Sequence, residues 1–95
     1  MEVLSSSNIV TIKGNIKNIS DLSDIRSVIE DVRVRFTSIV INIEDSISIT
    51  SSVIGYLNKI VLKDGIRLEM NIGSKQLLEL FSELNLAKTF NIKPI

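Results

Sequence analysis

Three consecutive hydroxyl side chains, Thr50, Ser51 and Ser52, stand just ahead of a run of apolar residues at helical spacing. Their oxygens can accept hydrogen bonds from the N–H groups that the first turn of a helix leaves unpaired, which makes them natural caps. The same free amides, together with the positive end of the helix dipole, also stabilise an anion. A phosphate on one of the serines would therefore be stabilised there, but the residues alone favour the interpretation as caps.

Two carboxylate pairs, Glu44 with Asp45 and Glu79 with Glu83, are the other candidates for chemistry. Adjacent carboxylates in a loop and i, i+4 carboxylates on a helix surface are usually solvated. The chain has no histidine and no cysteine, and its four glycines are isolated, so imidazole bases, thiolate nucleophiles and Gly-rich phosphate loops are missing. We expect no catalytic residue, metal or cofactor, and predict that the protein is not an enzyme.

Composition limits the classes of protein to which the chain can belong. The 95 residues predict one domain spanning 1–95. Eleven basic and eleven acidic residues are spread along the chain, which argues against a nucleic-acid surface or a polybasic membrane patch. No apolar run reaches bilayer length, and the first residues lack the pattern of a signal peptide. We therefore expect a cytoplasmic protein without membrane insertion.

The hydroxyl cluster is expected to lie between a strand and a helix. The β-branched run from Ile39 to Ile43 predicts a strand buried on both faces. After the loop 44–52, apolar residues at helical spacing predict a helix that starts near Ser51 and ends near Asp64 and Gly65.

The rest of the chain supplies the surrounding elements. Glu2–Ser5 and Ile9–Lys13 predict a β-hairpin, and a helix of about four turns should follow, with Ser20 as N-cap and Asp21 in its first turn. An alternating strand at 66–70 and a helix after Gly73-Ser74 come next, then a last helical turn and an edge strand. This order predicts an α/β domain with a mixed four- to five-stranded sheet, an N-terminal antiparallel hairpin and three to four helices. The loop 44–52 lies beyond the carboxyl ends of the parallel strands, where such sheets usually place functional loops.

The segments IVINIED, SISITSSVIGYL, KDGIRLEM and LLELFSELNLAKTF, in this order, resemble the STAS domain family, whose best-studied bacterial members are anti-sigma factor antagonists. The likeness covers about residues 9–92 and is most specific over 39–56. In that family the helix start typically reads Asp-Ser-Ser-Gly-Leu-Gly. Here Ser51 and Ser52 match the two serines, whereas Thr50 replaces the aspartate and Val53 the first glycine.

The resemblance implies a regulatory protein that binds a serine kinase which is also an anti-sigma factor, and that is released when the second serine of the motif is phosphorylated. That serine is Ser52, with Ser51 as second choice, and a cognate phosphatase would complete the cycle. An alternative keeps the fold without phosphorylation, as a scaffold or an accessory subunit of a larger assembly or transporter. Replacement of the aspartate by Thr50 and of glycine by the bulkier Val53 favours this alternative.

A partner surface is expected around the phosphorylation site. It comprises the hydroxyl cluster, the apolar side chains of Ile47, Ile49 and Val53, and a charged rim of Glu44 and Asp45. Alternatively, the loop isoleucines fold back to cover the helix. We expect the protein to be a monomer.

Overall fold

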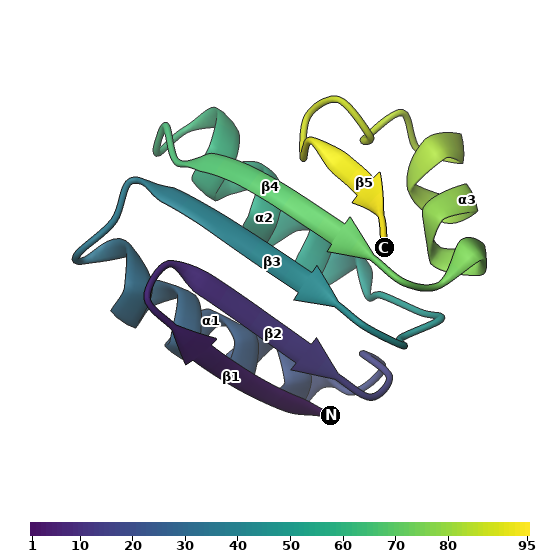
Figure 1. The fold of residues 1–95 in the computed structure, drawn as a ribbon, viewed down its shortest axis with the longest axis horizontal. Helices are drawn as coiled ribbons and strands as arrows, with labels where there is room; N and C mark the ends of the chain where they lie inside the picture. The colour runs from purple at the N-terminus through teal and green to yellow at the C-terminus, as the bar shows by residue number, and fades with distance from the viewer.

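The computed structural model describes residues 1–95 and shows one mixed five-stranded sheet with three helices (Figure 1). The strands are β1 (Glu2–Ser6), β2 (Ile9–Lys13), β3 (Ser38–Ile43), β4 (Arg67–Ile72) and β5 (Ile92–Pro94), and the helices are α1 (Ile19–Arg33), α2 (Ser51–Leu62) and α3 (Lys75–Glu83). The strands lie side by side in chain order; β1 is antiparallel to β2, and all later pairs are parallel. The predicted α/β class, the N-terminal hairpin and the edge strand are confirmed.

The helices cover one face of this sheet. Each parallel connection moves one strand further in the same direction, and right-handed crossovers then place every helix on the same side. In Figure 1, α1 and α2 lie behind the sheet. The side chains of Ile39, Ile41 and Ile43 point to that side and are buried, whereas Val40 and Asn42 on the opposite side are only half-buried. The prediction that β3 is buried on both faces is therefore wrong, because no helix covers the second face.

Helix α1 begins earlier than the sequence pattern suggested. Its N-cap is Asn18, so the prediction of Ser20 as N-cap is wrong. The buried carboxylate of Asp21 accepts hydrogen bonds from the backbone N–H groups of Lys17 and Asn18, both at 2.9 Å. These bonds lower the pKa of Asp21 and hold the chain in the turn that starts the helix. The predicted place of Asp21 in the first turn is confirmed.

The other helix ends follow the predicted chemistry. Gly65, which follows α2, has φ of +71°, a left-handed conformation that favours glycine, and the N–H of Ile66 donates to the carbonyl of Ile60 at 2.9 Å. Helix α3 is capped by Ser74, whose hydroxyl accepts from the N–H of Leu77 at 3.2 Å. Between α3 and β5 the chain forms turns rather than a fourth helix.

A single apolar core lies between the sheet and the helices. It comprises 20 buried residues: Val10, Ile12, Ile16, Ile25, Ile29, Val32, Ile39, Ile41, Ile43, Val53, Tyr56, Leu57, Ile60, Ile66, Leu68, Met70, Ile72, Leu77, Phe81 and Phe90. Phe81 and Phe90 meet edge to face with ring centroids 6.0 Å apart, which anchors the turns before β5 to α3. None of the helices is long and apolar enough to cross a bilayer.

Candidate functional site: the amino terminus of helix α2

The loop 44–50 leaves β3 at the carboxyl edge of the parallel strands and leads directly into α2. A buried serine fixes its course. The hydroxyl oxygen of Ser46, which is fully buried, accepts a hydrogen bond from the N–H of Ile16 at 3.0 Å and donates to the carbonyl of Ser48 at 2.7 Å. The hydroxyl of Ser48 donates in turn to the carbonyl of Ile16 at 2.8 Å. The loop after β2 and the loop after β3 are thereby joined by neutral hydrogen bonds that are buried or partly buried.

Two further bonds tie the same loops together nearer the solvent. The carboxylate of Asp45 accepts from the N–H of Gly14 at 2.8 Å, and the side-chain oxygen of Asn15 accepts from the N–H of Ile47 at 3.0 Å. The predicted rim residue Asp45 is exposed, but its carboxylate therefore already has a structural partner. Glu44 is exposed and has no such bond from its side chain.

Close packing against β4 also supports this loop. Gly73, which follows β4, lies so near the chain leaving β3 that an added Cβ would stand 2.1 Å from the carbonyl oxygen of Glu44. Its N–H donates to the carbonyl of Ile43 at 2.9 Å. Only glycine fits at this contact, and the path of the loop into α2 depends on it.

The hydroxyl cluster divides into one cap and two exposed serines. Thr50 is the N-cap of α2, with extended backbone angles, and its Oγ1 accepts from the N–H of Val53 at 3.2 Å. Ser51 and Ser52 occupy the first two helical positions and are exposed. The capping interpretation is thus satisfied by Thr50 alone, and both serine hydroxyls remain accessible.

Val53 lies on the inner side of α2. Its side chain is 1 % exposed and belongs to the core. The expectation that this valine adds bulk to the surface a partner would approach is therefore wrong, because the first turn of the helix directs position 53 towards the sheet. Ser51, Ser52 and Thr50 stay on the candidate surface, and the Val53 side chain does not.

The loop isoleucines have different environments. Ile49 is half-buried and packs against the core, as the alternative interpretation of these residues foresaw. Ile47 is 49 % exposed, which leaves an apolar side chain at the carboxyl edge of the sheet, close to the start of α2. Of the apolar contacts proposed for a partner, Ile47 is the one that the fold leaves most accessible.

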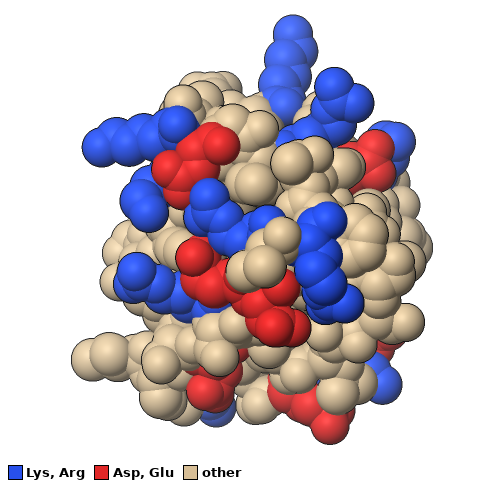
Figure 2. All heavy atoms as spheres, turned by 90° about the vertical axis from the view of Figure 1, so that its left-hand side faces the viewer, with Lys and Arg blue, Asp and Glu red and all other residues tan.

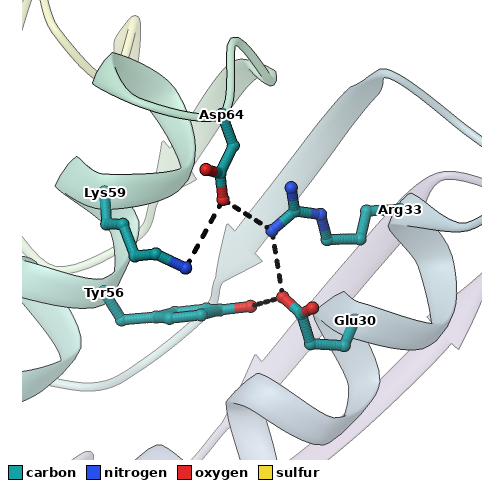
Figure 3. Close-up of polar contacts among 5 residues, drawn as sticks. All are labelled: Glu30, Arg33, Tyr56, Lys59 and Asp64. Carbon is teal, nitrogen blue, oxygen red and sulfur yellow. Dashed lines mark hydrogen bonds and ion pairs between the residues drawn. The ribbon is translucent and has the colours of Figure 1, made fainter.

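Helix α2 is joined to α1 by a polar network that the sequence analysis did not identify (Figure 3). The hydroxyl of Tyr56 donates to Glu30, and Arg33 bonds both Glu30, at 3.1 Å, and Asp64, at 3.0 Å. Lys59 lies 3.6 Å from the same Asp64 carboxylate. The Glu30 and Arg33 pair has the i, i+3 spacing of a helical ion pair and is visible in the sequence. The contributions of Tyr56, Lys59 and Asp64 depend on how the helices pack.

The network shifts the titration of its members. Burial, and then the hydrogen bond to Glu30, raises the pKa of Tyr56. The Tyr56 hydroxyl is the main cause of a lowered pKa at Glu30, and the Arg33 guanidinium is the main cause of a lowered pKa at Asp64. Both carboxylates are thus held in the charged form, and Tyr56 is held as the neutral phenol.

The carboxylates considered for acid–base chemistry are separated. Glu44 and Asp45 lie in the loop after β3, whereas Glu79 and Glu83 lie on α3, and all four are exposed. No group of three or more carboxylates is placed to hold a metal ion. On the face shown in Figure 2, basic and acidic side chains are interleaved rather than gathered by sign.

The protein is thus a single α/β unit with helices on one face of its sheet. Its hydroxyl cluster lies at the start of the central helix, α2. Comparison with protein-family models, with curated proteins and with solved structures yielded no match. The N-terminal antiparallel hairpin and mixed five-stranded sheet are compatible with a STAS-like fold.

Proposed function

We propose that this protein is a regulatory module of the anti-sigma factor antagonist type, switched by phosphorylation of Ser52. The observation that carries the proposal is that capping and exposure fall on different hydroxyl residues at the start of α2. Thr50 caps the helix, and Ser52 is exposed in the first turn with its hydroxyl unused by the fold.

The electrostatics of this turn suit a phosphate. The first intrahelical bond runs from the N–H of Ile54 to the carbonyl of Thr50, so the N–H groups of Ser51 and Ser52 precede the helical ladder. Phosphorylation would add about −1.5 to −2 charges beside these amides and the positive end of the helix dipole. The fold would tolerate this charge, and the main consequence would be weaker binding of a partner at this surface.

The partner is proposed to be a serine kinase that also acts as an anti-sigma factor. It would bind the unphosphorylated carboxyl edge, including the exposed Ile47 and the hydroxyls of Ser51 and Ser52. A partner surface that fits a neutral serine must desolvate or repel the phosphate, which costs several kcal/mol if it is unpaired. Because about 1.4 kcal/mol corresponds to a tenfold change in affinity, such a cost would release the partner.

The test is intact-mass measurement with site mapping on protein purified from its native cells. The proposal expects a species heavier by one phosphate in wild type, absent in Ser52→Ala and retained in Ser51→Ala. Phosphate retained in Ser52→Ala and lost in Ser51→Ala would move the site by one residue and contradict the assignment. Protein carrying no phosphate under every growth condition would reject the switch.

A second candidate is a STAS-like scaffold or accessory subunit that is not phosphorylated. The observation favouring it is the neutral N-cap: Thr50 stands where the resembled motif has an aspartate, and α2 has no acidic residue in its first turn. The mass experiment distinguishes the two candidates, because the scaffold carries no phosphate. The scaffold should also retain its partners in both serine variants.

A further inference from the structure

The outer side of α2, away from the sheet, carries a shallow groove distinct from the hydroxyl cluster. It is lined by Gly55, Asn58, Lys59, Leu62 and Lys63. The first four have the spacing i, i+3, i+4 and i+7, which is the spacing of the four residues that surround a side chain inserted from a second helix. The groove thus has the outline of a helix-docking site.

Three features come together in this groove. A Cβ added at Gly55 would meet no atom within 4 Å, so the floor of the groove is open. Leu62 beside it is 71 % exposed, and the buried side-chain oxygen of Asn58 has no hydrogen-bond partner. One exposed leucine is ordinary on a protein surface, but here it borders an open glycine notch and an amide oxygen without a hydrogen-bond partner.

The charge of the groove indicates which kind of helix could bind there. Its two charged residues are Lys59 and Lys63, and no carboxylate lines it. Asp64, at the end of α2, already pairs with Arg33 and Lys59, whereas Lys63 takes part in no ion pair. A second copy of the chain docked through the same groove would bring lysines against lysines, which is unfavourable.

We propose that this groove binds a helix of another protein that presents an apolar side chain flanked by carboxylates. The apolar side chain fills the notch at Gly55 against Leu62, and the carboxylates meet Lys59 and Lys63. The inference goes beyond the proposed switch, since it does not require phosphorylation of Ser52.

The experiment uses unphosphorylated protein labelled with ¹⁵N and two synthetic helical peptides. The peptides share one Leu/Ala pattern and differ only in having Glu or Lys at the flanking positions. The expected result is movement of the amide signals of residues 55–63 with the Glu peptide, and binding of the Lys peptide weaker by about tenfold or more.

Variants localise the binding. Gly55→Leu places a side chain in the notch, where an added Cβ meets no atom within 4 Å, and should weaken binding of the Glu peptide by about tenfold. Lys63→Glu should weaken it similarly by reversing a charge. Ser82→Leu adds the same side chain at an exposed position of α3 and should leave binding unchanged.

Equal binding of both peptides, no binding of the Glu peptide, or signal changes confined to other elements would each overturn the proposal. So would a dimer in sedimentation that Gly55→Leu abolishes, because the occupant would then be a second copy. Since no phosphate is involved, these outcomes are independent of whether the Ser52 switch holds.

Discussion

The two ends of helix α2 are held to the rest of the molecule by different kinds of interaction. At the amino end, the preceding loop is fixed largely by hydrogen bonds among backbone groups and neutral side chains, with Ser46 fully buried at its centre. From the middle of the helix onwards, Tyr56 and the following Asp64 are tied to α1 through Glu30 and Arg33, and Lys59 pairs with the same Asp64. The two ends should therefore respond differently to mutation, pH and salt.

The difference bears on the proposed phosphorylation of Ser52. If a phosphate is added there, the position of the helix start should depend little on nearby charges, which the phosphate would disturb. Buried neutral bonds provide such a support because their strength depends little on ionic strength, whereas partly exposed ion pairs are screened. The arrangement keeps the exposed Ser51 and Ser52 on a fixed base while the charged network lies further along the helix.

Gly73→Ala should have the largest effect. The added Cβ would lie 2.1 Å from the carbonyl oxygen of Glu44, so the backbone entering the loop 44–50 must move. We expect a loss of about 3 kcal/mol in the free energy of unfolding, measured by urea denaturation. Gly55→Ala is the matched control: its added methyl meets open space in a helix, and it should stabilise by about 0.5–1 kcal/mol. Equal stability of the two variants would show that the loop is not held as described.

Ser46→Ala should be next in size. It removes the buried acceptor of the Ile16 N–H and the donor to the Ser48 carbonyl. An unpaired buried amide costs about 1–3 kcal/mol, and this loss should be nearly the same at low and high salt. Urea denaturation at two ionic strengths measures both values. A loss that changes strongly with salt would contradict the contrast between the two ends of α2.

Tyr56→Phe tests the charged end. Loss of the hydroxyl bond to Glu30 should cost about 1 kcal/mol near neutral pH, a moderate value because Glu30 is partly exposed. The hydroxyl holds the folded-state pKa of Glu30 below its ordinary value of 4.5. A carboxylate with a depressed folded-state pKa contributes stability above its unfolded-state pKa, and this contribution is lost as pH falls through the folded-state value.

The difference in the free energy of unfolding between wild type and Tyr56→Phe should therefore decrease as the pH is lowered below 4.5. Thermal or urea unfolding across that range measures this difference. A difference that increases at acid pH would mean that the hydroxyl does not favour the charged form of Glu30.

The smallest effect is expected for a serine of the hydroxyl cluster. Thr50→Ala removes the cap bond to the Val53 N–H and should cost about 1 kcal/mol. Ser52→Ala removes an exposed hydroxyl without a structural bond and should change the free energy of unfolding by less than about 0.5 kcal/mol. If Ser52→Ala costs as much as Thr50→Ala, the serine is a structural cap and its availability to a kinase is weakened.

Local patterns predicted most elements of the fold. Alternating and helical apolar spacing located the hairpin, β4 and the helices, and the hydroxyls of Thr50 and Ser74 marked two helix starts. The start of α1 was mislocated although a local signal exists, since Asn18 with Asp21 three residues later has the spacing of a capping box. The partner-binding role of the residues around Ser52 stays a prediction.

The sequence by itself determined the order of elements, a hydroxyl cap at the start of α2 and the presence of serines there, because these depend on interactions within a few residues. Only the tertiary structure decided that one face of β3 is open, that Val53 points inward and that Tyr56 reaches Glu30, 26 residues away. Such features depend on which side of the sheet the crossovers place the helices and on how α1 and α2 pack. The spacing of residues along the chain does not show which distant residues will be in contact. Arg33 and Asp64, for example, meet only in the folded molecule.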